Sequence, residues 1–281
     1  MEAQLRALVA AVFPPVCRPP WRRLEPGQAR GQAACSRFRQ TAGMEAPSAP
    51  PVPRPLMHHR WTAVTFLHWP YPPQVVQRLL PPGLEVDRAD GTAWVGLVPF
   101  RMEDVRLPRL PPLPWASRFP ETNVRTYVRD RHGRVGIWFL SLDAARLGAV
   151  VTARVAYGLP YFWAAMSVRR DRDRVRYQSR RRPGTAAARS RALVEVGTAF
   201  DQGELGPLDH FLTARFRLYT MIAGRGAAAD AEHPSWPLVR ARLLDLEDDL
   251  VAAAGLPPPD QPPLVHFSPG VEVRIGRWRL V

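Results

Sequence analysis

The sequence contains no lysine, and all 39 of its basic residues are arginine. Catalysis through a Schiff base between a lysine amine and a carbonyl compound is therefore excluded at every internal position. The formal net charge is nevertheless +14, a balance that would ordinarily favour a nucleic-acid partner. Heavy use of arginine, alanine, glycine and proline is typical of a GC-rich coding sequence, which weakens that interpretation.

Cysteine is also scarce. Cys17 and Cys35 are the only two, and both precede residue 36, so neither a disulfide framework nor a cysteine-rich metal site can hold the main body of the chain together. No apolar run approaches the roughly 20 residues of a membrane span. The apolar segment 7–17 is interrupted by two prolines and is not typical of a secretion signal. We therefore expect a cytoplasmic protein without a membrane partner.

Several catalytic signatures are missing as well. The sequence has no glycine-rich phosphate loop, no His-Glu-x-x-His, no Gly-x-Ser-x-Gly and no Cys-x-x-Cys, and these absences remove the strongest sequence signals for nucleotide, zinc, serine-hydrolase and dithiol chemistry. His58 and His59 are adjacent, so on a strand they would point to opposite faces. We expect neither a metal site nor another cofactor.

The composition of the sequence changes near residue 55. Residues 1–55 are rich in alanine, arginine and proline and show no sustained period of 2 or 3.6, so we expect a disordered N-terminal extension. Met44 offers an alternative start, which would place the preceding residues outside the protein. Residues 56–281 are expected to form a single domain, because the 46% hydrophobic content is ample for a core.

Residue periodicity predicts an α+β fold made of many short strands and a few helices. The strand patterns cover 61–69, 192–200 and 264–280, with hairpins over 85–101, 122–142 and 161–181. The helical patterns cover 74–80, 144–153, 206–221 and 236–254. There is no alternation of strands and helices of the kind that would indicate a doubly wound parallel sheet.

Polar side chains alternate with apolar ones in the segment 119–143. Glu121, Asn123 and Arg125 share one parity, and so do Ser141 and Asp143. Residues of one parity lie on one face of a strand, so the segment predicts a polar pocket set against an apolar wall. The alternative is a face that is simply solvated, which is common for charged strand residues.

A second polar feature is the basic run Arg169–Arg191, which contains ten arginines interrupted by Asp171 and Asp173. We interpret it as a solvated hairpin. Nucleic-acid binding through this run remains the alternative, but we do not expect a nucleic-acid partner.

Seven short motifs in order along the chain resemble one family. They are Phe66–Pro70, Leu80–Leu84, Asp90–Phe100, Glu121–Val128, Gly158–Tyr161, Phe211–Tyr219 and Pro263–Ser268. The chain resembles the YqjF-like family of uncharacterised bacterial proteins, within the acetoacetate decarboxylase-like superfamily. This resemblance implies a β-cone or closed antiparallel barrel with a few flanking helices and a cavity lined by polar groups.

The resemblance also implies a site. Enzymes of the superfamily carry a nucleophilic lysine after an arginine-containing helix, and in the matching stretch from Arg154 to Tyr161 the tyrosine stands in the place of the lysine. Glu121 matches the carboxylate partner of those enzymes. We therefore expect Glu121 and Tyr161 as acid–base groups, and Asn123, Arg125, Arg154, Arg215 and Tyr219 as ligand-binding groups. Arg215 and Tyr219 would project side by side from the helix predicted over 206–221.

The function predicted from these residues is binding of a small molecule with a carboxylate or carbonyl group in a barrel cavity, without Schiff-base decarboxylation. A non-catalytic ligand-sensing or structural module is the alternative, in which Glu121 pairs with Arg125 or Arg154 only to order the barrel. The sequence leaves open whether the chain forms a homo-oligomer.

Overall fold

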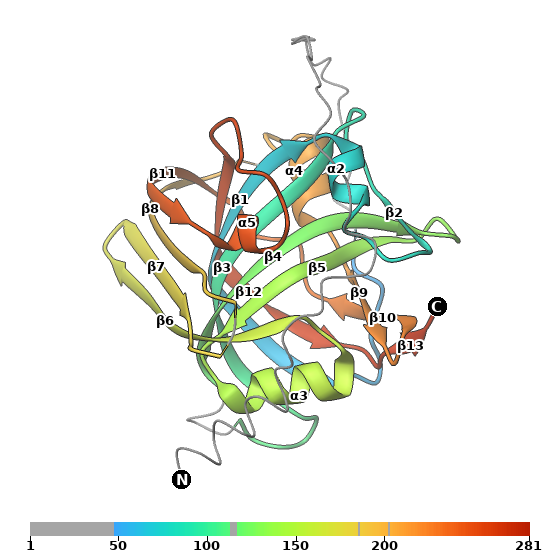
Figure 1. Ribbon diagram of the computed structural model, residues 1–281. Helices are drawn as coiled ribbons and strands as arrows, with labels where there is room; N and C mark the ends of the chain where they lie inside the picture. Colours follow the sequence, from blue (N-terminus) through green and yellow to red (C-terminus); the bar gives the residue numbers. More distant parts are fainter. Residues whose placement is uncertain (1–47, 113–116, 185, 202) are drawn as a thin grey trace.

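The computed structural model describes residues 48–112, 117–184, 186–201 and 203–281 (Figure 1). The expected disordered extension lies mainly on residues 1–47, outside the described part. The alternative start at Met44 and both cysteines also lie there. Val52 is buried and its backbone N–H donates to Glu232 Oε2 at 2.7 Å. Contacts of the barrel therefore begin before residue 56, where the sequence placed the domain boundary.

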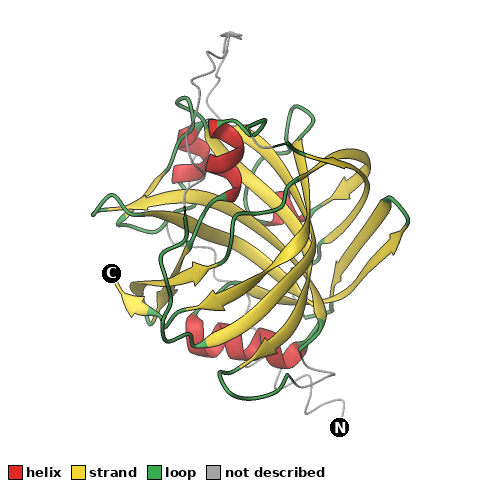
Figure 2. Cartoon of the chain, turned by 180° about the vertical axis from the view of Figure 1, so that it is seen from behind, coloured by secondary structure: helices red, strands yellow, loops and turns green. Residues whose placement is uncertain are grey.

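Strands make up most of the described chain, and helices are few and short (Figure 2). The strands are β1 (Met57–Tyr71), β2 (Leu84–Val86), β3 (Ala93–Arg106), β4 (Phe119–Asp130), β5 (Val135–Ala144), β6 (Tyr161–Asp171), β7 (Arg174–Arg181), β8 (Arg189–Ala199), β9 (Arg217–Ile222), β10 (Arg225–Glu232), β11 (Val239–Asp248), β12 (Leu264–Ile275) and β13 (Arg279–Leu280). The helices are α2 (Pro73–Gln77), α3 (Leu147–Tyr157), α4 (Pro207–Thr213) and α5 (Leu250–Ala253).

The strands form one sheet that closes on itself, which confirms the predicted barrel. The hydrogen-bonded order β5-β6-β7-β8-β11-β12-β1-β3-β4 returns to β5 through the β4–β5 pairing. A second closure runs from β5 through β9 and β10 to β12. Both closures share the strands β12, β1, β3, β4 and β5. Because β5 pairs in parallel with β6 and with β9, the barrel is mixed rather than purely antiparallel.

The shared strands β1, β3, β4 and β5 are largely buried on both faces, which explains the long apolar run at the start of β3. One face packs on β7 and β8 through residues such as Leu67, Val124 and Val194. The other face packs on β9 and β10 through residues such as Phe66, Phe100 and Leu218. The two cores therefore lie back to back on opposite faces of the same strands.

Three elements differ from the sequence prediction. Residues 85–101 do not form a hairpin, because β2 pairs with β4 and not with β3. The predicted helix 206–221 is helical only as α4, and it is followed by β9. The predicted helix 236–254 is mainly the strand β11, which pairs with β8. In both mistaken helices, strand pairing outweighs the local helical pattern.

Other predicted elements are confirmed. β4 and β5 form the hairpin expected over 122–142, and β6 and β7 form the one expected over 161–181. The helix expected over 144–153 is α3, displaced toward the C-terminus. In Figure 1, α3 lies at one end of the barrel, and α4 and α2 lie at the other.

Candidate functional site

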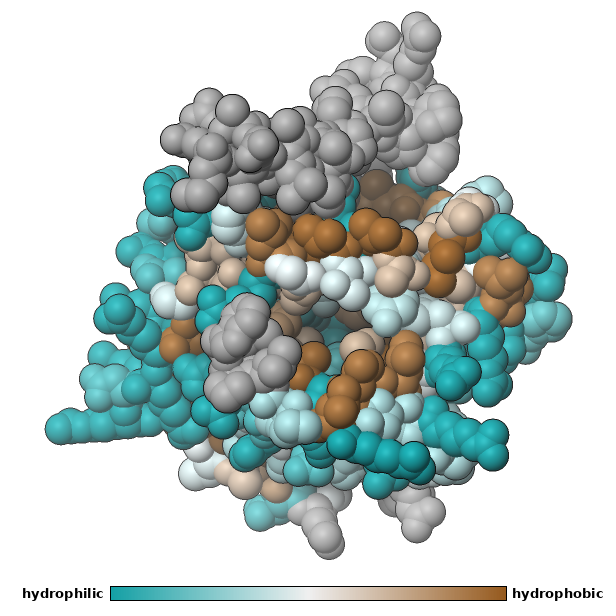
Figure 3. All heavy atoms as spheres, turned by 90° about the horizontal axis from the view of Figure 1, so that it is seen from below, coloured by the Kyte–Doolittle hydropathy of each residue, from teal (hydrophilic) through white to brown (hydrophobic). Residues whose placement is uncertain are grey.

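A cavity of about 530 Å³ lies inside the closure that contains β9 and β10. Its wall is largely apolar, with Val64, Phe66, Phe100 and Leu218 among the lining residues. Residues of α3 and of the loop after β3 line it at one end. Figure 3 views the molecule from that end, and hydrophobic side chains gather around a hollow in this face.

The alternating polar residues of β4 face this cavity. Glu121, Asn123 and Arg125 all line it and are 3%, 5% and 6% exposed. Such low exposure excludes the alternative in which the row is simply solvated. The neighbouring Val124 and Val128 point into the other core, as the two-residue period of a strand requires.

Ser141 and Asp143 do not join this polar row. The β4–β5 register shifts between Val124 and Arg125, and such a bulge changes which residues of a strand face each side. Asp143 instead forms a buried ion pair with Arg181 of β7, with Nε and Oδ1 at 2.9 Å. This carboxylate therefore serves the packing of β5 on β7.

Glu121 and Tyr161 form the closest polar pair of the cavity. The Tyr161 hydroxyl donates to Glu121 Oε2 at 2.8 Å, although the two residues come from separate strands. Burial raises the pKa of the Glu121 carboxyl to about 8; the hydrogen bond from Tyr161 opposes this rise and Asp143 adds to it. Burial, together with the adjacent Glu121, holds the pKa of the Tyr161 phenol well above its usual range. At neutral pH both groups therefore carry protons for most of the time.

Arg125 is a buried cation that has no acidic partner among the residues the structure describes. Its Nη2 donates to the Leu212 carbonyl oxygen at 3.3 Å, and its guanidinium lies 5.4 Å from the centre of the Phe66 ring. Within the part of the chain that the structure describes, no carboxylate comes within ion-pairing distance of Arg125, and its Nε has no hydrogen-bond partner. The Oδ1 atom of Asn123, two residues before it, is unpartnered in the same sense.

This arrangement bears on the alternative in which Glu121 forms a structural ion pair. Among the described residues, neither Arg125 nor Arg154 lies within ion-pairing distance of Glu121, and neither arginine contributes to the pKa shift of its carboxyl. Glu121 instead pairs with the Tyr161 hydroxyl.

Arg215 also lines the cavity, but its charge is compensated. Its Nη1 lies 2.9 Å from Asp87 Oδ2, and its Nε donates to the Phe211 carbonyl oxygen at 2.8 Å. Its guanidinium stacks 4.2 Å from the centre of the Phe211 ring. These bonds fix Arg215 between α4 and Asp87, so Arg125 is the better partner for an anion.

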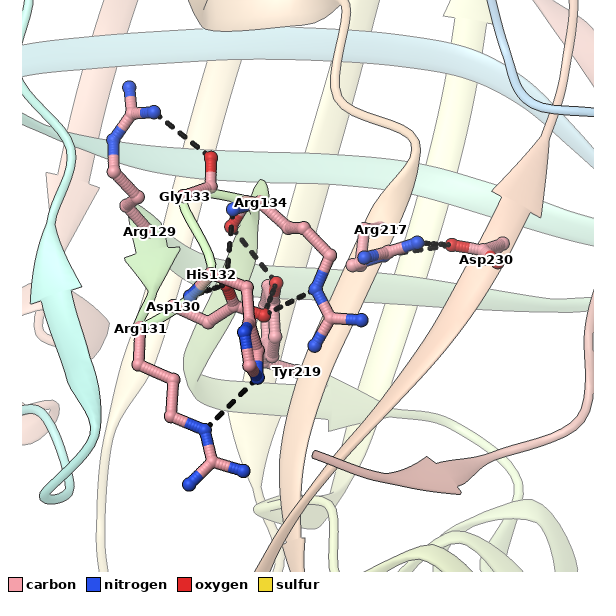
Figure 4. A network of polar contacts seen from close by, with 9 residues as sticks. All are labelled: Arg129, Asp130, Arg131, His132, Gly133, Arg134, Arg217, Tyr219 and Asp230. Carbon is pink, nitrogen blue, oxygen red and sulfur yellow. Dashed lines mark hydrogen bonds and ion pairs between the residues drawn. The ribbon is translucent and has the colours of Figure 1, made fainter.

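The structure places two predicted ligand-binding residues away from the cavity wall. Arg154 donates from Nη1 to the Tyr161 carbonyl oxygen at 2.7 Å, so it holds the segment that carries Tyr161. Tyr219 lies on β9, not on a helix beside Arg215. Its hydroxyl lies 3.0 Å from both Asp130 Oδ2 and the Arg134 carbonyl oxygen and can donate to either, within the network that holds the β4–β5 turn (Figure 4).

The sequence did not single out the aromatic part of the wall. Trp61 and Trp236 line the cavity and stack with ring centres 6.1 Å apart. The edge of Trp236 also meets Phe66, with ring centres 5.2 Å apart. The parity of Val64, Phe66 and His68 along the first strand could have indicated one side of this wall, but Trp236 falls in the segment mistaken for a helix.

His68 and Tyr127 belong to the same hydrogen-bond network as Arg125. His68 Nε2 lies 2.6 Å from the Tyr127 hydroxyl, which donates to the same Leu212 carbonyl oxygen that Arg125 contacts. Burial, followed by the charge of Arg125, holds the pKa of His68 well below its usual range. The histidine is therefore neutral and adds no second positive charge beside Arg125.

The basic run 169–191 is largely engaged within the protein. Arg181 is buried against Asp143, and Arg191 lies 3.0 Å from Asp245 and 2.9 Å from Glu247. The first pair links β7 to β5, and the other two link β8 to its neighbour β11. The hairpin predicted for the start of the run is the antiparallel pair β6–β7.

The described residues contain neither a metal-binding cluster nor a membrane-spanning helix. They contain no group of three or more histidine, cysteine, aspartate or glutamate side chains arranged to hold a metal ion. No helix among them is long and apolar enough to cross a membrane.

Comparison with known proteins identifies the family. The family model DUF2071, described as an uncharacterized conserved protein, matches residues 58–272. The uncharacterized protein YqjF of Bacillus subtilis (strain 168) is 36% identical over 213 residues, which cover 76% of this chain and 87% of that protein.

Solved structures show the same fold at low sequence identity. The enduracididine biosynthesis enzyme MppR complexed with pyruvate has a TM-score of 0.57 and 17% identity, covering 80% of this chain and 90% of that one. An acetoacetate decarboxylase-like enzyme from Sphingomonas wittichii RW1 has a TM-score of 0.56 and 16% identity, over 80% of this chain and 92% of that one. The acetoacetate decarboxylase of Legionella pneumophila has a TM-score of 0.54 and 14% identity, over 85% and 92%. The chain therefore belongs to the DUF2071 family of uncharacterized conserved proteins, and its barrel has the acetoacetate decarboxylase-like fold.

Proposed function

We propose that the cavity binds a small molecule carrying a carboxylate or carbonyl group, with Arg125 as the partner of the anionic group. The observation that carries this proposal is the burial of the Arg125 guanidinium on the cavity wall without an acidic partner among the described residues. A guanidinium stays charged in proteins, and a buried charge is costly unless it is paired. A carboxylate in the cavity would supply that pair, in the bidentate geometry that guanidinium groups favour.

Glu121 and Tyr161 are the acid–base candidates of the proposal. A buried carboxyl with a pKa of about 8 can donate a proton or a hydrogen bond to a carbonyl oxygen at neutral pH. The Tyr161 hydroxyl orients that carboxyl through the 2.8 Å hydrogen bond. Neither group can form a Schiff base, so any reaction in this cavity proceeds without the covalent imine that a lysine would provide.

One solved structure of the same fold supports the proposed class of ligand. MppR has been solved in complex with pyruvate, a small keto acid, and it shares the barrel fold. A protein of the same fold can thus bind a molecule that carries a carboxylate beside a carbonyl group. The residues of the present chain that would do so are those of β4, and the proposal rests on them.

The proposal is tested by thermal-shift measurements on the purified protein against small carboxylates and their uncharged amides. We expect saturable stabilisation by carboxylates and not by the matched amides. Arg125→Gln should abolish this stabilisation, whereas Arg242→Gln, at an exposed arginine of β11, should leave it unchanged. Equal stabilisation of the wild-type protein by acids and amides would contradict the proposal.

Product analysis on the acids that bind separates an enzyme from a non-catalytic module. If turnover occurs, Tyr161→Phe should lower kcat while the protein keeps its melting temperature. Binding without any product would identify a ligand-sensing module and would leave the role of Arg125 intact.

A further inference from the structure

The polar groups of the cavity lie in a fixed order along β4. Arg125 is bonded to the Leu212 carbonyl oxygen of α4, so it lies at the end of the barrel that α4 covers. Phe119 begins the strand and lines the end that α3 and the loop after β3 surround. Figure 1 places these two helices at opposite ends of the barrel. At about 3.3 Å per residue, the strand spans roughly 20 Å from Phe119 to Arg125.

The cation is therefore at one end and the hollow seen in Figure 3 is at the other. Glu121 and Tyr161 lie between them, because Glu121 follows Phe119 by two residues on the same face. A ligand that has its anionic group at Arg125 and fills the cavity would extend past the Glu121–Tyr161 pair toward α3.

The wall along this path suits an apolar body. Phe66 lies beside Arg125 and packs on Trp236. Val98, Phe100, Trp61 and Met102 continue the apolar wall toward the α3 end, because Trp61 pairs with Met102 and Met102 with Phe119. Two further lining residues beyond them, Leu107 and Leu110, are 50% and 56% exposed. Apolar surface thus continues from the interior to the outside of the protein.

The size of the cavity also favours a ligand with a large apolar body. Pockets of roughly 300–1,000 Å³ with mostly apolar and aromatic walls accommodate drug-sized ligands, and this cavity measures about 530 Å³. A three-carbon or four-carbon keto acid would leave most of that wall without contact. The volume and the lining therefore favour a ligand considerably longer than pyruvate.

We infer that the ligand is an elongated, mainly apolar monocarboxylic acid, bound with its carboxylate inward at Arg125 and its chain along the aromatic wall toward α3. This inference rests on the proposed function, because it takes the Arg125–carboxylate pair as its starting point. It adds the class of acid and the direction in which the acid lies. A linear acyl chain and an arylalkanoate share this chemistry.

The inference is tested by calorimetric titration with acetoacetate, butyrate, octanoate and decanoate, and with naphthylacetate as the aromatic acid. Each buried methylene should strengthen binding about fourfold, so decanoate should bind at least about a hundredfold more tightly than butyrate. Decanamide serves as the uncharged control and should bind much more weakly than decanoate. Comparison of decanoate with naphthylacetate decides between the two kinds of chain.

A substitution on α3 tests the direction of the chain. Ala153 lines the α3 end of the cavity, so Ala153→Phe should fill that end and weaken decanoate at least about tenfold while butyrate binds as before. Ala156 is exposed on the same helix and does not line the cavity. Ala156→Phe is therefore the matched control and should leave the chain-length preference unchanged.

The outcomes distinguish this inference from the proposed function. If butyrate and acetoacetate bind as tightly as decanoate and all require Arg125, the inference is wrong and the proposed function stands. If decanamide binds as tightly as decanoate, or if no acid binds, both are wrong. Weakened butyrate binding in a folded Ala153→Phe protein would reverse the proposed direction.

Discussion

Glu121 and Arg125 lie on the same face of one strand, and burial makes a charge on either side chain costly. The Glu121 carboxyl can take up a proton, and burial raises its pKa to about 8. The Arg125 guanidinium cannot lose its charge, so it depends on the Leu212 carbonyl oxygen and the Phe66 ring. The polar row of β4 thus combines a neutral acid with an uncompensated cation.

Protonation of Glu121 predicts how stability depends on pH. Its carboxyl has a pKa near 4.5 when unfolded and about 8 when folded, so between these values the folded state holds a proton that the unfolded state has released. The free energy of unfolding should then fall as pH rises, by at most roughly 1.4 kcal/mol per pH unit between about pH 5 and pH 8.

Glu121→Gln removes this titration and provides the control. The unfolding free energy of the wild-type protein minus that of the Glu121→Gln protein, measured by urea denaturation at several pH values, should become steadily more negative as pH rises, because only the wild type loses stability through this carboxyl. Parallel curves for the two proteins would show that Glu121 does not change its protonation on folding.

Absence of lysine predicts the result of a trapping experiment. Borohydride reduction in the presence of a β-keto acid should leave no adduct on any internal residue, because no internal amine is present to form an imine. Mass spectrometry of the digested protein provides the measurement. An adduct at the N-terminal amine would not count, whereas one on an internal peptide would overturn the account of the site.

At the scale of elements, the turn after α3 sets the position of Tyr161. Gly158 ends the helix with φ at +63°, and a Cβ atom there would lie 1.9 Å from the Met221 carbonyl oxygen. Only glycine satisfies both conditions, since other residues are strained at positive φ. The segment that follows carries Tyr161 to Glu121.

Gly158→Ala should therefore destabilise the protein by about 1–3 kcal/mol. Thermal or urea unfolding measures the change. Gly148→Ala lies in the same helix, where an added Cβ meets nothing within 4 Å, and it should be neutral or stabilising because alanine is the better helix former. Equal effects of the two substitutions would contradict the role assigned to Gly158.

The sequence predicted strands better than helices, for a physical reason. In β4 the alternation of polar and apolar residues agrees with the pairing that the strand adopts, so its cavity face could be predicted residue by residue. In Gly206–Met221 the apolar spacing favoured a helix, yet residues after Ala214 pair with β10 and β5. Pairing between distant strands is absent from local periodicity, and so Tyr219 was placed beside Arg215 by mistake.

At the scale of the whole molecule, the site depends on contacts between distant parts of the chain. Glu121 and Tyr161 are 40 residues apart, and Arg125 and Leu212 are 87 apart. The family resemblance predicted that Glu121 and Tyr161 belong to one site, and the structure shows them hydrogen-bonded. No sequence signal indicated that Arg215 has the carboxylate of Asp87 as a partner while Arg125 has no acidic partner among the described residues, because that depends on how α4 lies over the barrel.

The whole molecule also permits a test of its N-terminal part. A chain that starts at Met44 retains all of the described contacts, including the bond of Val52 to Glu232. We expect it to keep the melting temperature of the full chain within experimental error in differential scanning calorimetry. A loss of several degrees would show that the first 43 residues stabilise the barrel.

The central claim is that Arg125 pairs with the carboxylate of a ligand inside the barrel. A crystal structure of the full chain with decanoate bound tests it most directly. We predict a carboxylate within hydrogen-bonding distance of the Arg125 guanidinium, with the chain running past Glu121 and Tyr161 toward α3. An acid bound only on the surface, or in the cavity with its carboxylate away from Arg125, would contradict the claim.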